Sequence, residues 1–122
     1  MFKELSPKEA EKLLENSNGV ILDVRTQHEW DKFHLERNNV KLIPVDQLET
    51  RYEELNNKSQ LIVVTCRAGV RGAAASELLD QKGFTNIVNV QGGLLEWVTY
   101  LSQSGQMNEN KFQETFMLLM SH

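Results

Sequence analysis

The chain has 122 residues, of which 40% are hydrophobic and 25% are charged, and this composition suits one folded domain. The net charge of −4 gives no general attraction to nucleic acid or to an anionic membrane, so we expect neither as a partner. No apolar run is long enough to span a membrane. The single cysteine excludes an internal disulfide and favours a reducing, cytoplasmic location.

Short apolar segments alternate with helical patterns along the chain, which is typical of an α/β domain with a mostly parallel sheet. The predicted strands lie at residues 2–5, 20–24, 40–43, 61–65 and 87–90. The predicted helices begin near residues 6, 26, 46, 71 and 93, and a last amphipathic helix contains Phe112, Phe116 and Leu119. Because the strand at 61–65 is the most apolar, we place it in the centre of the sheet.

Local signals mark the ends and faces of these helices. Ser6 and Thr26 are each followed three residues later by glutamate, which is the pattern of a capping box. Asp46 stands in the same place ahead of Glu49, so the sequence predicts a third cap there. In the helix at 71–82, the residues expected to face the core are Ala74, Ala75, Leu78 and Leu79.

The strand at 61–65 ends at Cys66, and a short basic loop leads from it into the next helix. Such a loop presents backbone N–H groups and the positive end of a helix dipole to an anion. A cysteine in this place is a thiolate more often than a free cysteine is, and the thiolate is the reactive form. The candidate nucleophile is therefore Cys66, and the candidate binding residues are Arg67, Ala68, Gly69, Val70, Arg71 and Gly72.

Asp23 and Arg25 follow the strand at 20–24, and sites in open parallel sheets form at the carboxyl ends of strands. We therefore expect both residues near Cys66. We interpret them as an ion pair that braces the site, and His34 as a structural hydrogen-bonding residue. Three scattered histidines and one cysteine disfavour a metal site, and no cofactor is expected.

The length of the loop after Cys66 limits the size of the group that it can surround. Four residues separate Cys66 from Arg71, whereas cysteine-dependent phosphatases place five residues between their cysteine and arginine to surround a phosphate. The shorter loop makes a tighter ring. It suits a sulfur atom attached to the cysteine better than a tetrahedral phosphate.

Four segments together resemble the single-domain rhodaneses, a family of sulfurtransferases. They are 22–25 with Glu29 and Trp30, His34 followed by 43–44, 66–71, and 90–93 with Trp97. The resemblance implies a three-layer α/β fold with a five-stranded parallel core. It also implies that Cys66 takes sulfane sulfur from a donor such as thiosulfate, forms a persulfide, and passes the sulfur to cyanide, a thiol or a protein acceptor. Arg67 and Arg71 would bind the donor anion or stabilise the persulfide.

The chain departs from the family pattern at 35–41, a longer segment than usual beside the expected site, and beyond residue 101. We therefore divide it into a domain at 1–101 and a linker with a C-terminal amphipathic helix at 102–122. This helix is expected to fold back onto the domain, and a homodimer formed through it is the lesser alternative. Two other functions stay open: a non-catalytic rhodanese module for binding or sensing, and a cysteine-based phosphatase or arsenate reductase.

Overall fold

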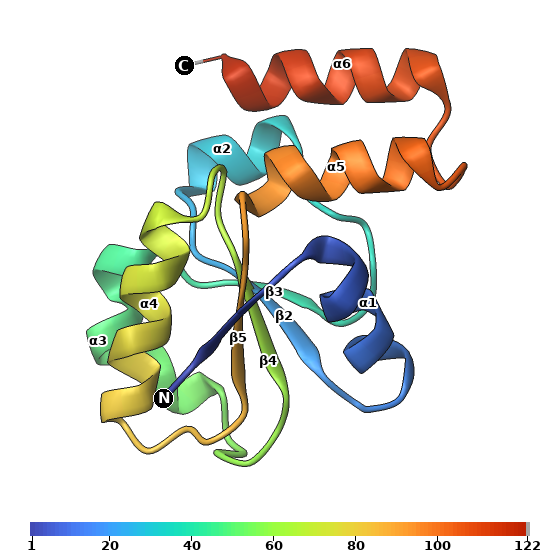
Figure 1. Cartoon of the computed structure of the whole chain (residues 1–122). Coiled ribbons are helices and arrows are strands. Elements are labelled where there is room, and N and C mark those ends of the chain that lie inside the picture. Colours follow the sequence, from blue (N-terminus) through green and yellow to red (C-terminus); the bar gives the residue numbers. More distant parts are fainter. Residues whose placement is uncertain (122) are drawn as a thin grey trace.

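The computed structural model describes residues 1–121 and has three layers around a five-stranded sheet (Figure 1). The strand order is β1-β5-β4-β2-β3, and every neighbouring pair is parallel. The strands are β1 (Lys3–Leu5), β2 (Val20–Asp23), β3 (Val40–Leu42), β4 (Ile62–Thr65) and β5 (Ile87–Val90). The predicted α/β fold class is confirmed, with β4 in the centre and β1 at an edge.

Within residues 1–121, six α-helices flank the sheet. They are α1 (Pro7–Glu15), α2 (Gln27–Lys32), α3 (Leu48–Arg51), α4 (Val70–Gln81), α5 (Gly93–Gln103) and α6 (Glu109–Met120). Helices α1 and α5 cover one face of the sheet, and α3 and α4 cover the other. Helix α6 lies outside α5 and also contacts α2 (Figure 1). The loop after β4 rises toward α2 at the same end of the sheet.

Alternate side chains of the three inner strands, β2, β4 and β5, enter two separate apolar cores. In β4, Val63 faces α1 and α5, while Ile62 and Val64 face α3 and α4. Both faces are buried, which explains why the strands are almost continuously apolar in the sequence. Cys66, the residue after β4, belongs to the core on the α3 and α4 side. The site loop therefore starts from a rigid, fully packed strand.

Two of the three predicted helix caps are confirmed. Ser6 and Thr26 each accept a hydrogen bond from the third helical residue, and the glutamate there accepts one in return. The cap predicted at Asp46 is wrong. The chain instead forms a 3-10 turn at 45–47, the short α3, and another 3-10 turn at 52–54. The N–H of Val45 still bonds to the carbonyl of Val24 at 3.0 Å, so the chain leaves the sheet too late for Asp46 to cap a helix.

The buried face of α4 differs from the predicted one. Ala75 and Leu79 are buried as expected, but Ala74 is exposed and Ser76 is buried in its place. The helix begins one residue earlier than predicted, and its inner stripe runs through Gly72, Ala75, Ser76 and Leu79 at helical spacing. Buried Ser76 is satisfied because its hydroxyl donates to the carbonyl of Gly72 at 2.8 Å.

The C-terminal segment folds back onto the domain as α6. This helix runs antiparallel to α5 (Figure 1). Leu119 is buried, and Phe112 and Phe116 pack against the core beside α5. The predicted segment 102–122 ends with His122, which lies outside the described residues, and α5 itself continues through Gln103. Within residues 1–121, no helix is both long and apolar enough to cross a membrane.

Candidate active site

The sulfur of Cys66 lies at the N-terminus of α4. Its Sγ accepts hydrogen bonds from the N–H groups of Gly69 at 3.0 Å and Gly72 at 3.2 Å. Gly69 is the N-cap residue of α4 but has no side chain to cap it, so the sulfur takes the place of a capping oxygen. The φ angle of Gly69 is 101°, which a residue with a side chain rarely adopts. Because the sulfur accepts hydrogen bonds at the N-terminus of α4, it lies at the positive end of the helix dipole.

Other N–H groups of the loop remain available for an anion. Within residues 1–121, four of them make no hydrogen bond: those of Arg67, Ala68, Val70 and Arg71. The sequence predicted donors from Arg67 through Gly72. The structure assigns two of these donors to the sulfur and leaves four for a bound group.

Two carbonyl groups of the loop, those of Cys66 and Arg67, accept hydrogen bonds from the start of α5. At the start of α5, the N–H of Leu94 donates to the carbonyl of Cys66 at 2.8 Å, and the N–H of Leu95 donates to the carbonyl of Arg67 at 3.1 Å. Because these carbonyls have partners on the far side, the N–H groups are free to face the anion. The start of α5 thus fixes the backbone of the Cys66 loop through these two hydrogen bonds.

Asn89, on β5, is a site residue that the sequence analysis missed. Its side chain is buried, and Nδ2 donates to the carbonyl of Gly69 at 3.2 Å and to the carboxylate of Glu4 on β1. Its Oδ1 has no hydrogen-bond partner within the described residues and lies against Gly72, where a Cβ would overlap with it. Asn89 therefore touches both glycines that donate to the sulfur. One feature of the sequence could have indicated Asn89: it is the single polar residue in the otherwise apolar strand β5.

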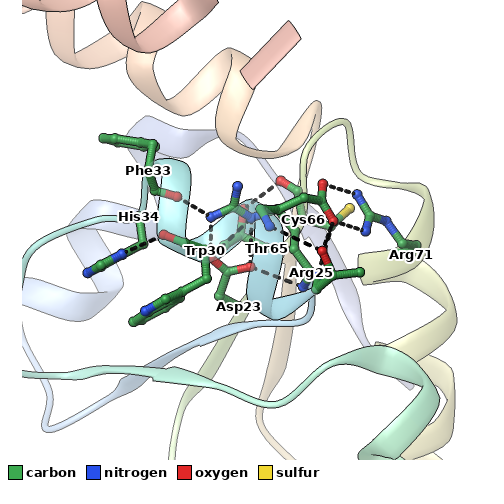
Figure 2. Close-up of polar contacts among 10 residues, drawn as sticks. Asp23, Arg25, Trp30, Phe33, His34, Thr65, Cys66 and Arg71 are labelled. Carbon is green, nitrogen blue, oxygen red and sulfur yellow. Dashed lines mark hydrogen bonds and ion pairs between the residues drawn. The ribbon is translucent and has the colours of Figure 1, made fainter. Parts of the chain in front are cut away.

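Arg71 is held by Glu29 of α2. Its guanidinium donates to the two carboxylate oxygens of Glu29 at 2.6 and 2.9 Å. These hydrogen bonds lower the pKa of Glu29 from its ordinary value of 4.5 to about 2, against the opposing effect of burial. They also raise the pKa of Arg71 above its ordinary value, and attraction to Cys66 and Asp23 adds to this rise. Figure 2 shows Arg71 beside the Cys66 sulfur.

Arg67 differs from Arg71 in having an uncommitted guanidinium. It is half-buried, and within residues 1–121 its side chain makes no ion pair or hydrogen bond. It lines the same cavity as Arg71, Arg25 and Glu29. Of the two loop arginines, Arg67 is therefore the one whose positive charge is not paired within the described residues.

Asp23 and Arg25 form a buried ion pair at the edge of the site (Figure 2). The Arg25 guanidinium donates to both Asp23 oxygens and, at 2.8 Å, to the carbonyl of Phe33 after α2. Asp23 also pairs in the sheet with Thr65, the residue before Cys66. The pair thus joins β2, β4 and the end of α2, an arrangement that fits the predicted brace.

The segment that follows α2 is held by contacts with α2, α1 and α5 rather than by the Cys66 loop. His34 stacks on Trp30 with ring centroids 3.8 Å apart, and its Nδ1 lies 2.9 Å from the Trp30 carbonyl (Figure 2). Further along, Arg37 donates to both oxygens of Glu11 at 2.7 Å and sits 5.7 Å from the ring centre of Trp97. The longer segment is therefore clamped to α1 and α5. Within residues 1–121, no cluster of three or more His, Cys, Asp or Glu side chains is arranged for a metal ion.

The fold and the site define a three-layer α/β domain with a short loop whose N–H groups surround one cysteine, placed at the carboxyl edge of a parallel sheet. The chain belongs to the rhodanese-like domain family, whose sequence model matches residues 6–100. This match confirms the predicted family and the predicted fold. It leaves α6 outside the matched range.

The relatives of this chain carry different names. The rhodanese-like domain-containing protein 17 of Arabidopsis thaliana is 32% identical over 101 residues, covering 74% of this chain and 64% of that protein. The putative sulfur carrier protein YrkF of Bacillus subtilis is 34% identical over 77 residues, covering 63% and 40%. The structure of the human single-domain sulfurtransferase TSTD1 is 25% identical with a TM-score of 0.67, covering 79% and 95%.

The chain thus spans less than two thirds of the length of these two curated relatives. The family match supports a function in sulfur transfer in general terms. The donor, the acceptor and the roles of the individual site residues stay predictions.

Proposed function

We propose that the protein is a sulfurtransferase that carries sulfane sulfur on Cys66. The Cys66 thiolate attacks the outer sulfur of a donor such as thiosulfate, and a new S–S bond forms at the cysteine. The S–S bond of the donor breaks, and sulfite leaves with its electron pair. A thiophilic acceptor, such as cyanide or a thiol, then attacks the outer sulfur of the persulfide and releases the Cys66 thiolate.

The observation that carries this proposal is the pair of N–H groups on the Cys66 sulfur, from Gly69 and Gly72. A persulfide anion spreads its negative charge over two sulfur atoms. The unpartnered N–H groups of the same loop supply donors for the second atom, and each charge-assisted hydrogen bond is worth about 1.5–3 kcal/mol. In this proposal, Arg67 binds the donor anion, and Arg71 places its charge beside the sulfur.

A non-catalytic rhodanese module is the second candidate, and one observation favours it. Cys66 is only 1% exposed, and it is not among the residues that line the neighbouring cavity. A catalytic cycle requires the donor to reach this sulfur, which a purely binding or sensing module does not. Direct sulfur loading separates the two candidates.

The test is the intact mass of the full chain after exposure to thiosulfate, to mercaptopyruvate and to a cysteine desulfurase with its persulfide. We expect a protein heavier by one sulfur atom, with loss of that atom as thiocyanate when cyanide is added. Cys66→Ser should gain no mass. Equal loading of Cys66→Ser would refute the persulfide on Cys66, and no loading from any donor would favour the non-catalytic module. Turnover of an aryl phosphate that disappears in Cys66→Ser would favour the phosphatase alternative.

Three further parts of the proposal concern the surroundings of the protein. We propose a thiol or a protein as the physiological acceptor, and we retain the cytoplasmic location predicted from the single cysteine. A homodimer through the C-terminal helix would bury Met117 and Met120, which are exposed on α6. Light scattering on wild type and on Met117→Asp tests this dimer, because the charge should shift a dimer toward monomer.

A further inference from the structure

The peptide group between Gly69 and Val70 is held on its carbonyl side only. The carbonyl accepts hydrogen bonds from the N–H of Ala73 at 3.0 Å and from Nδ2 of Asn89 at 3.2 Å. The N–H, which belongs to Val70, makes no hydrogen bond within residues 1–121. Because the C=O and N–H of a trans peptide point in opposite directions, the contact with Asn89 turns the Val70 N–H away from β5.

Gly69 itself does little to fix the direction of this peptide group. Its φ of 101° lies in the left-handed region, and a glycine moves between backbone regions at little cost. Its own N–H donates to the Cys66 sulfur at 3.0 Å, so any movement of Gly69 also changes that contact. Asn89 supplies an external support, since its side chain is 1% exposed and comes from a strand inside the sheet.

Glu4, on the edge strand β1, fixes which end of the Asn89 amide faces the loop. The two residues are direct partners in the parallel pairing of β1 with β5, and Nδ2 donates to both Glu4 oxygens, at 3.0 and 2.9 Å. A reversed amide would bring Oδ1 against the Glu4 carboxylate and the Gly69 carbonyl, which accept hydrogen bonds but cannot donate them. The charge of Glu4 therefore keeps Nδ2 on the side of Gly69.

This orientation has a cost at the other end of the amide. Oδ1 of Asn89 is buried without a hydrogen-bond partner within the described residues. It lies beside Gly72 near the reactive sulfur, because a Cβ at Gly72 would be 2.3 Å from Oδ1 and 3.6 Å from Sγ of Cys66. A buried oxygen without a partner lowers stability, so the amide keeps this orientation because Glu4 and Gly69 both require Nδ2.

Given the sulfurtransferase activity proposed above, we infer that Glu4 is a positioning residue that acts through Asn89 on the loop of the reactive cysteine. The Glu4 carboxylate directs the amide of Asn89. The amide holds the Gly69 carbonyl, and the Val70 N–H stays directed at the group bound on the sulfur. Glu4 precedes the residues 6–100 that match the family, so this contribution comes from a strand outside the matched range.

Charge alone and positioning predict opposite effects of Glu4→Gln. A carboxylate near the loop repels an anionic donor, so its removal would speed sulfur loading if Glu4 acted only by its charge. If Glu4 directs Asn89, the neutral side chain loosens the support of Gly69, and loading becomes slower. Glu4 is exposed on an edge strand and glutamine has nearly the same shape, so we expect this variant to fold as wild type does.

The experiment measures how fast the full chain gains one sulfur atom at saturating thiosulfate, and the thiosulfate concentration that gives half of this rate. Removing a hydrogen-bond donor from an anion site costs about 100-fold or more in rate, and misdirecting one should cost less. We expect a maximal rate about threefold lower in Glu4→Gln and about tenfold lower in Asn89→Ala, with little change in the half-saturating concentration. The double variant should match Asn89→Ala, because Glu4 acts through Asn89.

Lys3→Gln is the matched control, because Lys3 is exposed on the same strand but pairs with Val88 and not with Asn89. It should load sulfur at the wild-type rate. A maximal rate of Glu4→Gln equal to or above that of wild type would overturn the inference. An effect of Glu4→Gln that persists unchanged in the Asn89→Ala background would overturn it too. If urea unfolding shows lost stability while the maximal rates stay equal, the two residues are structural only.

A binding measurement separates this inference from the proposed function. Sulfate is an anion without a transferable sulfur, so it reports the loop geometry even if no donor loads Cys66. It should shift the amide resonance of Val70 in wild type and bind about threefold more weakly to Glu4→Gln. Tighter binding to Glu4→Gln would refute the positioning role. Wild type that binds sulfate in this way but gains no sulfur from any donor would refute only the proposed function.

Discussion

Glu29 and Arg71 are joined by two hydrogen bonds, at 2.6 and 2.9 Å, although 42 residues separate them in the sequence. This ion pair connects α2 to the first turn of α4 beside the Cys66 sulfur. It leaves Arg71 positioned but largely neutralised by its partner. Arg67, which has no such partner within residues 1–121, is left as the uncommitted positive charge of the loop.

The first prediction is that Glu29→Gln lowers stability in a pH-dependent way. The pKa of Glu29 is depressed from 4.5 to about 2, so its contribution is fully present above pH 4.5 and is lost as the pH falls toward 2. Both side chains are partly exposed, so we expect a loss of about 1 kcal/mol at neutral pH. Urea unfolding between about pH 7 and pH 3 measures the difference, which should shrink below about pH 4.5.

Glu53→Gln is the control for this titration, because Glu53 is exposed and makes no ion pair within the described residues. Its stability should follow that of wild type at every pH. A wild-type advantage over Glu29→Gln that stays constant through the acidic range would contradict the depressed pKa.

The second prediction concerns the carboxylate that remains when Arg71 is removed. Arg71→Ala should weaken thiosulfate use more than it weakens folding, partly because the unpaired Glu29 then repels the anionic donor. The double variant Glu29→Gln with Arg71→Ala should recover part of this loss, about threefold or more in kcat/KM. Steady-state kinetics with thiosulfate and cyanide measure kcat/KM for wild type and for the single and double variants. If the double variant is no better than Arg71→Ala, Glu29 has no electrostatic effect on the donor.

The third prediction couples Gly72 with Asn89. A Cβ at position 72 overlaps with Oδ1 of Asn89, so Gly72→Ala should cost about 1–3 kcal/mol. Asn89→Ala removes the hydrogen bond to the Gly69 carbonyl and should cost about 1–2 kcal/mol. In the double variant the overlap is gone, so its stability should equal or exceed that of Asn89→Ala alone.

Urea unfolding of the four proteins in this cycle measures the coupling, and the rate of sulfur loading by Cys66 reports the geometry of the loop. Asn86→Ala, at an exposed asparagine just before β5, is the control for loading and should match wild type. Additive losses of stability would show that Asn89 does not set the space around Gly72.

The fourth prediction is that Asp23→Asn destabilises the protein by about 3–5 kcal/mol, because it leaves the buried guanidinium of Arg25 without a counter-charge. Replacing both partners, as Asp23→Leu with Arg25→Met, should cost less than Asp23→Asn alone. The exposed pair of Arg51 and Glu54 gives the comparison, and Glu54→Gln should cost much less stability than Asp23→Asn, because water screens an exposed pair. A similar loss of stability for Asp23→Asn and Glu54→Gln would show that burial does not determine how much the Asp23–Arg25 ion pair contributes to stability.

The sequence by itself determined the features that depend on neighbouring residues. The capping boxes at Ser6 and Thr26, the apolar strands and the Cys66 loop all arise from groups within a few positions of one another. The same local reasoning failed at Asp46, where a hydrogen bond from the N–H of Val45 to the carbonyl of Val24, the residue after β2, overrides the local capping pattern.

Only the tertiary structure decided which distant groups complete the site. Asn89 becomes part of it because β5 lies beside β4, and Glu29 because α2 packs next to the start of α4. Leu118 and Leu119 reach the cavity beside the Cys66 loop because α6 packs on α5 and contacts α2. Each partner comes from a separate element, and contacts between elements depend on how the layers pack, which no local pattern in the sequence specifies.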